Sequence, residues 1–311
     1  MANIAFVFSG QGAQYPGMGE SLSKISPAAA SLYDRAETLR PGIRALSFSG
    51  TAEELKETVN TQPALYLTDL SAALALREAG IEPSAVAGFS LGELPALAFA
   101  GAYPADEGFS LVLERAKLMA KASHDMPDTP AMAAVMRMPP EQIEEICQKL
   151  ENVWPANYNA PEQTVISGTA SGVAAFKAAC AEAGISARMV DLPVSGAFHT
   201  PFMAQASEAF GEVLAGVRFA KPSIPSYANL TGTRYPDDPA EYGHILAAQI
   251  MNPVRWVGEI RALIDAGIDT FVECGPGKTL CGLIKKIDKS VAAYNVENEE
   301  TLAAALAAIQ G

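Results

Sequence analysis

The sequence of 311 residues is poor in cysteine and histidine, and both shortages narrow its chemistry. Its cysteines show no Cys-x-x-Cys spacing and have no histidine near them; they are Cys147, Cys180, Cys274 and Cys281. Scattered cysteines of this kind are typical of reduced thiols in the cytoplasm, not of a disulfide framework or a zinc site. We therefore expect a cytoplasmic protein with no bound metal.

Positive charge and long apolar runs are also scarce. Lys and Arg number 22 against 35 Asp and Glu, a net charge of -13, which excludes general nucleic-acid binding because that needs clustered cations. No stretch approaches the ~18 consecutive apolar residues of a membrane span. The short apolar run 4–8 lacks a preceding basic region, so it predicts a first strand and not a signal peptide.

Short apolar strands alternate with amphipathic helices along most of the chain. Strands are expected at 4–8, 85–89 and 270–273, and helices at 61–78 and 91–100. This alternation predicts an α/β fold, with a parallel sheet core like that of α/β-hydrolases and helices on both faces.

The rhythm changes between residues 127 and 195. Strands at 132–138, 153–158, 164–168 and 186–192, with helices at 140–150 and 172–183, give the order β-α-β-β-α-β of a ferredoxin-like unit. We expect this small domain (127–195) to be inserted into a large catalytic domain made of 1–126 and 196–311. A cleft between the two is the expected place for a site.

A serine at a strand-to-helix junction is the leading candidate nucleophile. Residues 88–92 read Gly-Phe-Ser-Leu-Gly, the G-x-S-x-G pattern that lets the backbone turn sharply and project the Ser90 hydroxyl at a helix N-terminus. The alternative is a serine that merely caps an ordinary glycine-rich turn.

A serine nucleophile needs a base, and the chain offers three histidines. His124 falls in an expected linker and His244 on a partly exposed helical segment. His199 follows a glycine-containing turn at the domain junction, where a base facing the cleft is expected. The alternative for any single histidine is a surface or structural imidazole.

Arg115 lies on the wrong face of its predicted helix for a charged residue. It follows Leu111 by four positions and precedes Met119 by four, which places it on the apolar stripe. A buried guanidinium needs a partner and is suited to bidentate binding of a carboxylate. An internal ion pair or an extended path to the surface is the alternative; a substrate carboxylate would indicate a dicarboxylic half-thioester such as malonyl.

Together these segments resemble the malonyl-CoA:acyl carrier protein transacylases and the acyltransferase domains of polyketide synthases. The resemblance runs in order along nearly the whole chain, through 8–14, 17–19, 88–93, Arg115 with Met119, 157–159, 196–199, Gln249, 252–256 and 273–277. It implies malonyl transfer from CoA to the phosphopantetheine thiol of an acyl carrier protein, for fatty acid or polyketide synthesis.

The resemblance also implies the central catalytic roles. Ser90 would be the nucleophile and His199 the general base, then acid. The backbone N–H groups of Gln11 and Leu91 would form the oxyanion hole. The main-chain carbonyl of Gln249 would hold His199, in place of the acid of a Ser-His-Asp triad.

Three further residues are assigned to the substrate on the same basis. Arg115 would bind the malonyl carboxylate, Asn159 would lie near the acyl site, and Phe198 would leave little room for an α-branch. No cofactor or metal is implied, and a monomer is expected. The chain departs from many members in having Phe89 where they have histidine, which puts acyl or acceptor preference in doubt.

Two rival functions remain open at this level. A serine thioesterase or hydrolase shares G-x-S-x-G, but it places its histidine late in the chain with an acid before it, and Asp191 is the only acid close upstream of His199. A catalytically silent subunit that docks carrier protein is the second.

Two lysine-containing segments near the C-terminus are considered as binding sites, one for a nucleotide and one for a partner protein. The run 275–279 is not a P-loop, because position 272, which would have to be glycine, is Val272. The cluster Lys278, Lys285, Lys286 and Lys289 is a hypothetical docking surface for an acidic carrier protein. A solvated helix end, where cations are favoured, is the alternative.

Overall fold

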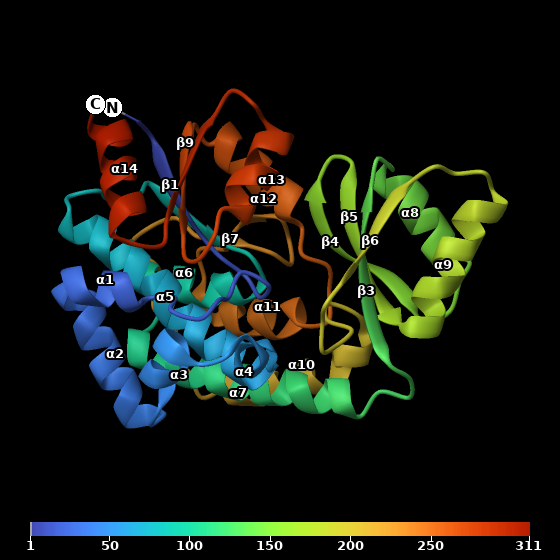
Figure 1. The fold of residues 1–311 in the computed structure, drawn as a ribbon, viewed down its shortest axis with the longest axis horizontal. Coiled ribbons are helices and arrows are strands. Elements are labelled where there is room, and N and C mark those ends of the chain that lie inside the picture. The colour runs from blue at the N-terminus through green and yellow to red at the C-terminus, as the bar shows by residue number, and fades with distance from the viewer. Residues whose placement is uncertain (1) are drawn as a thin grey trace.

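The computed structural model describes residues 2–311 and contains two four-stranded sheets, each with its own helices, and one two-stranded hairpin (Figure 1). One sheet is parallel and lies among most of the helices. The other is antiparallel and lies on the opposite side of the view with two helices of its own. Within residues 2–311 no helix is both long and apolar enough to cross a bilayer.

The first sheet is entirely parallel, with the strand order β10-β9-β1-β2. Its strands are β1 (Ile4–Phe8), β2 (Ala85–Gly88), β9 (Thr270–Cys274) and β10 (Ala292–Val296). Alternate residues of β1 enter different cores: Phe6 and Phe8 pack into one, Ala5 and Val7 into the other. The sheet is therefore covered on both faces, as the alternation of strands and helices predicts.

Helices of the N-terminal half cover one face and late helices the other. The first core takes residues from α5 (Thr58–Glu78), α6 (Glu93–Ala100) and α7 (Ala105–His124), and the second from α12 (Trp256–Asp265) and α13 (Thr279–Ile287). The remaining elements of this part are α1 (Glu20–Ile25), α2 (Pro27–Leu39), α3 (Ile43–Ser49), α4 (Ala52–Lys56), α10 (Ala204–Leu214), α11 (Tyr242–Gln249), α14 (Glu299–Gln310), the hairpin β7 (Tyr227–Ala228) and β8 (Thr233–Arg234), and the 3-10 turns η1 (Ser90–Gly92), η2 (Pro201–Met203) and η3 (Pro239–Glu241).

The second sheet has the predicted β-α-β-β-α-β order. It comprises β3 (Pro130–Met136), α8 (Pro140–Cys147), β4 (Val153–Ala160), β5 (Gln163–Thr169), α9 (Ala170–Glu182) and β6 (Arg188–Leu192), with strand order β4-β5-β3-β6. All its strand pairs are antiparallel. A third apolar core, around Phe176 and Ile166, lies between this sheet and its two helices.

One strand of the small sheet is hydrogen-bonded to the catalytic part of the chain. The backbone N–H of Tyr158 donates to the carbonyl of Val254, at 2.9 Å, and the N–H of Val254 donates to Ala156 at 2.9 Å. These bonds fix β4 against the segment that precedes α12. The domain boundaries at 126/127 and 195/196 stay a prediction.

Most element boundaries differ by a few residues from the sequence-based expectation, and two of the differences concern residues of interest. The helix expected at 91–100 begins as the 3-10 turn η1 and becomes α-helical only at Glu93. His124, expected in a linker, is instead the last residue of α7. Apolar periodicity locates helices well and their ends poorly.

The turn after β2 is packed directly against β1. A Cβ atom at Gly92 would lie 2.2 Å from the carbonyl oxygen of Phe8, closer than any side chain can approach backbone. We expect Gly92→Ala to lower the free energy of unfolding by about 1–3 kcal/mol, as overpacking does, measured by urea denaturation. Gly282→Ala is the control, because its Cβ would meet open space in α13; a loss of stability there equal to that of Gly92→Ala would contradict the packing argument.

Candidate active site

Ser90 lies at the sharp turn between β2 and α6, in a backbone conformation that only a constrained residue adopts. Its φ is 53°, in the left-handed region that costs a non-glycine residue free energy. Gly88 makes the turn possible, since a Cβ there would lie 2.0 Å from the backbone of Gly92. The turn projects the half-buried Ser90 hydroxyl from the carboxyl end of the parallel sheet.

His199 contacts that hydroxyl directly. Its Nε2 lies 2.8 Å from Ser90 Oγ, and its Nδ1 lies 3.0 Å from the carbonyl oxygen of Gln249 and 3.1 Å from that of Asn252. Carbonyl oxygens can only accept, so the neutral ring carries its proton on Nδ1 and presents the Nε2 lone pair to the serine. The ring is thereby oriented as a base, by two carbonyls and without a carboxylate.

His199 shares the unusual backbone of the serine. Its φ is 60°, and its N–H donates to the carbonyl of Ile250 at 3.2 Å. Burial, and to a smaller extent the positive charge of Arg115, lowers the pKa of His199 to about 4. The imidazole is therefore neutral, and able to accept a proton, throughout the physiological pH range.

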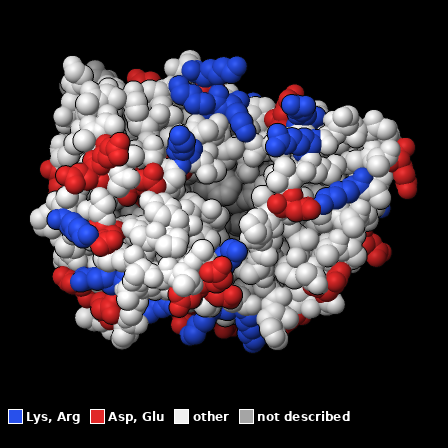
Figure 2. All heavy atoms as spheres, viewed as in Figure 1, with Lys and Arg blue, Asp and Glu red and all other residues white. Residues whose placement is uncertain are grey.

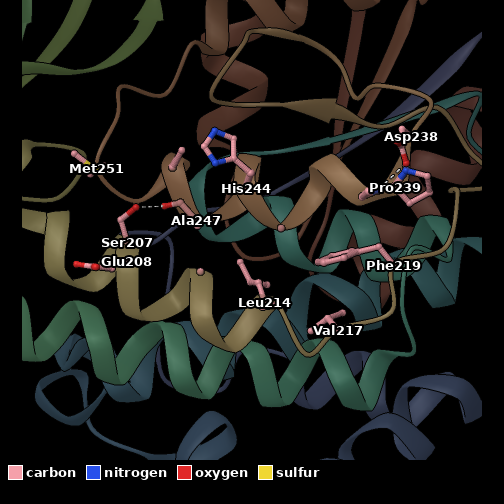
Figure 3. A pocket seen from close by; sticks show the side chains of 15 residues that line it. Ser207, Glu208, Leu214, Val217, Phe219, Asp238, Pro239, His244, Ala247 and Met251 are labelled. Carbon is pink, nitrogen blue, oxygen red and sulfur yellow. Dashed lines mark hydrogen bonds between the residues drawn. The ribbon is translucent and has the colours of Figure 1, made fainter.

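The other two histidines lie elsewhere. His124 ends α7, with 90% of its side chain exposed and Asp125 as its neighbour. His244 lies among the side chains of a separate hollow of about 850 Å³ between α10 and α11 (Figure 3). Of the three histidines, only His199 is hydrogen-bonded to Ser90.

Arg115 is buried, with 1% of its surface exposed, and its guanidinium points at the same serine. Its Nη2 donates to Ser90 Oγ at 3.2 Å and to Gln249 Oε1 at 2.9 Å, and its Nη1 donates to Gln62 Oε1 at 2.7 Å. All these partners are neutral, and within residues 2–311 no carboxylate forms an ion pair with Arg115. Burial lowers its pKa to about 10, so the charge persists at neutral pH.

Gln249 connects all three groups. Its carbonyl holds His199, its Oε1 accepts from Arg115, and its Nε2 donates to the carbonyl of Ser90 and to Glu93 Oε2, each at 2.8 Å. Burial raises the pKa of Glu93 to about 7, despite hydrogen bonds from Tyr235 and Gln249 that favour its charged form. A polar network thus lies beneath the nucleophile, with the arginine charge at its edge.

Gln11 and Leu91 line the same cavity as Ser90. Within residues 2–311 neither backbone N–H donates a hydrogen bond, whereas the side chain of Gln11 donates to Thr58. Backbone N–H groups without a partner can stabilise an anionic oxygen where they face a cavity. Their geometry toward a bound thioester stays a prediction.

The cavity has a volume of about 360 Å³ and lies between the two sheets. Phe198 is 6% exposed and lines it beside the base, while Asn159 enters from β4, with its Oδ1 buried and unpaired. The apolar wall is completed by Met119, Met132, Ala134, Val165, Leu192 and Val194. Within the described part of the chain, no three His, Cys, Asp or Glu side chains gather to hold a metal.

Two buried residues of this site carry no signal in the sequence. Gln62, on α5, accepts from Arg115, and Asn229, between β7 and β8, accepts from the N–H of Ser90 at 2.6 Å. Gln62 stands in an apolar helix next to Pro63, and Asn229 in a turn where asparagine is common. Only their three-dimensional neighbours distinguish them.

We expect the His199 ring to titrate near pH 4, well below the 6.5 of a free imidazole. Between pH 6.5 and pH 4 the unfolded chain would bind a proton that the folded chain does not, so this residue's contribution to the free energy of unfolding falls as the pH falls through that window. The ring C–H shifts in NMR measure the titration, with His124→Gln and His244→Gln for assignment. A ring that titrates at or above pH 6.5 would contradict the burial argument.

Comparison with known proteins places this geometry in a family. Residues 5–305 match the acyl transferase domain family. The chain is 38% identical to the malonyl CoA-acyl carrier protein transacylase of Bacillus subtilis, over 98% of this chain and 97% of that protein. A crystal structure of MCAT from Streptococcus pneumoniae superposes with a TM-score of 0.93 at 38% identity, covering 98% of this chain and 100% of that one.

A second solved structure, a malonyl-transacylase (PlMCAT) in complex with the type II polyketide synthase acyl-carrier protein AntF, has a TM-score of 0.92 at 33% identity, over 99% of this chain and 100% of that one. The similarity covers nearly the whole chain, including both four-stranded sheets, the turn at residues 88–92 and the glycine-containing loop at residues 275–277. On this basis the chain belongs to the malonyl-CoA:acyl carrier protein transacylase family of acyl transferases.

Proposed function

We propose that this chain moves malonyl from CoA to an acyl carrier protein through an ester on Ser90. The observation that carries the proposal is the contact of one hydroxyl with two groups of different function. Ser90 Oγ lies 2.8 Å from His199 Nε2, which takes its proton, and 3.2 Å from Arg115 Nη2, which recognises the acid. A thioester of a dicarboxylic acid satisfies both contacts.

Acylation begins with attack of Ser90 Oγ on the thioester carbonyl carbon, as its proton passes to His199 Nε2. The N–H groups of Gln11 and Leu91 stabilise the oxyanion. Collapse of the tetrahedral intermediate breaks the C–S bond, and the proton on Nε2 passes to the departing CoA sulfur. The Nδ1 bonds to the carbonyls of Gln249 and Asn252 hold the ring, and stabilise its cationic form, through both transfers.

Transfer repeats these steps with a new nucleophile. His199 Nε2 takes the proton of the phosphopantetheine thiol, the sulfur attacks the Ser90 ester, and the serine oxygen leaves with that proton. Because the acyl-enzyme persists between two substrates, water must be kept from it. The apolar cavity wall favours this, and the malonyl carboxylate held by Arg115 closes the inner end.

Arg115 selects the acyl group by charge. Within residues 2–311 its hydrogen-bond partners are two amides and one hydroxyl, so a carboxylate gains a buried, charge-assisted bond that an uncharged acyl group cannot form. Asn159 Oδ1 and Phe198 complete the pocket, the first as a polar contact and the second as a limit on α-branching. One methyl group is worth only about 1–3 kcal/mol, so this second selection is modest.

The carrier protein is proposed to dock beside α13. Thr279, Leu280 and Leu283 of this helix line the cavity, while Lys278, Lys285, Lys286 and Lys289 of the lysine cluster lie exposed on or next to it. Figure 2 shows basic side chains gathered on the part of this face where α12 and α13 lie. A local positive surface on a chain of net charge -13 would attract an acidic carrier protein.

We also propose where the protein works and how it assembles. All four cysteines are free thiols in the fold, which supports a reducing cytoplasm. We propose a monomer, since the contacts of Ser90 with His199 and Arg115 are complete within a single chain.

Intact-mass measurement with malonyl-CoA tests the acyl-enzyme. We expect one malonyl adduct on the wild type and none on Ser90→Ala, because within residues 2–311 Ser90 supplies the only hydroxyl or thiol that is hydrogen-bonded to the His199 ring. Arg115→Ala should lower kcat/KM for malonyl-CoA by roughly 100-fold, the scale for losing one partner of a buried charge pair, and should not lower that for acetyl-CoA.

The acyl-enzyme experiment has two contradicting outcomes. A wild type that takes up acetyl but not malonyl would overturn the role of Arg115. A wild type that takes up no acyl group yet binds carrier protein would favour a docking subunit without catalysis.

Charge reversal tests the lysine cluster. Lys285→Glu with Lys289→Glu should raise the carrier KM several-fold and leave malonyl loading unchanged, because neither lysine lines the cavity or donates to a residue that does. The matched control is Lys117→Glu with Lys149→Glu, two exposed lysines of which the first lies on α7 and the second in the turn after α8. A carrier KM that shifts equally in both double variants, or in neither, would leave the cluster as a solvated helix end.

A further inference from the structure

A short segment outside the main sheet runs beside the strand that leads into the nucleophile. Ser226 pairs with Val86 of β2 in a parallel bridge, and the N–H of Val86 donates to the carbonyl of Pro225 at 2.9 Å. Three residues beyond Ser226, Asn229 is fully buried directly beneath the Ser90 turn. The pairing with β2 therefore sets where this asparagine lies.

The Asn229 amide bridges the two residues that flank Phe89. Its Oδ1 accepts from the N–H of Ser90 at 2.6 Å, and its Nδ2 donates to the carbonyl of Gly88 at 2.7 Å. The backbone N–H is only a donor and the carbonyl only an acceptor, so the orientation of the amide is fixed by chemistry. One planar group thus closes the turn 88–90 from below.

Asn229 is itself held from three sides. Its N–H donates to Glu93 Oε2 at 3.1 Å, its carbonyl accepts from the N–H of Arg255 at 3.0 Å, and its Nδ2 also donates to Glu259 Oε1 at 2.6 Å. Every polar group of the residue has a partner. The amide therefore cannot turn away without breaking several buried hydrogen bonds.

We propose that Asn229 is a positioning residue for acyl transfer: its side-chain amide holds the Gly88–Ser90 turn in the strained conformation that aims the Ser90 hydroxyl at His199. This inference rests on the proposed role of Ser90 as nucleophile. A non-glycine φ of 53° persists only where surrounding contacts impose it, and this amide contacts both ends of the turn.

This pair of hydrogen bonds of the Asn229 amide with Ser90 and Gly88, here called the clip, also distinguishes two neighbouring backbone donors. Because the N–H of Ser90 is bound to Asn229, it does not face the cavity as a free donor. The next N–H, of Leu91, donates to no group in residues 2–311. Asn229 thereby positions the hydroxyl and the adjacent oxyanion donor relative to each other.

Single-turnover malonylation followed by mass spectrometry tests the proposal. In Asn229→Ala we expect the acylation rate to fall on the order of 100-fold, the scale for a small displacement of a reacting group. The dissociation constant of malonyl-CoA, measured with and without Asn229→Ala in a Ser90→Ala background, should stay within about twofold, because Arg115 is untouched.

Two further variants separate positioning from structure. Glu259→Gln keeps an acceptor for Asn229 Nδ2 and leaves the clip intact, so it should acylate at the wild-type rate. Asn229→Leu keeps roughly the volume but can neither accept from the N–H of Ser90 nor donate to the carbonyl of Gly88, so it should be slow. If Asn229→Ala does not fold, Asn229→Leu decides the question.

Amide hydrogen exchange in the wild-type protein tests the role of Asn229 independently of any variant. The amide proton of Ser90 should exchange slowly with solvent and that of Leu91 quickly, as measured by hydrogen exchange in NMR. A folded Asn229→Ala or Asn229→Leu that acylates within twofold of wild type, or a rapidly exchanging Ser90 amide, would overturn the proposal. A wild type that takes up no malonyl would instead contradict the proposed function itself.

Discussion

The geometry of the site depends on two residues, Ser90 and His199, whose backbones are held in the unfavourable left-handed region. Ser90 and His199 both have φ near 60°, and their side chains meet at 2.8 Å. Each conformation costs roughly 1–2 kcal/mol, so packed neighbours must hold it: Gly92 against β1 on one side, Asn229 beneath, and the carbonyls after α11 around the imidazole. The parallel sheet gives these neighbours a rigid base. The backbone strain that they impose aligns the Ser90 hydroxyl with the His199 ring.

A second constraint is a positive charge buried without a carboxylate. Arg115 is stabilised by Gln62 and Gln249, which are neutral, and at longer range by Glu93, whose pKa burial raises to about 7. The arrangement leaves the guanidinium charged but incompletely compensated. It also explains why His199 is held by carbonyls, because a carboxylate beside the imidazole would compete with the substrate for the same arginine.

Local patterns predicted most of this architecture. Alternating strands and helices predicted the parallel sheet, the β-α-β-β-α-β order predicted the small sheet, and the apolar stripe around Arg115 predicted its burial. The family resemblance supplied the carbonyl of Gln249, which no spacing could. Asn229 and Gln62 went unnoticed because their roles arise from contacts across 139 and 53 positions of sequence, beyond any periodicity. Helix ends differed for the ordinary reason that packing extends or tightens the last turn.

The uncompensated charge of Arg115 has a consequence for the lifetime of the protein. A carboxylate that binds only the folded state raises its stability by mass action, and an acyl group tethered to Ser90 occupies the site at a high effective concentration. On the proposed mechanism, the acylated protein would therefore resist unfolding and proteolysis better than the same protein without an acyl group.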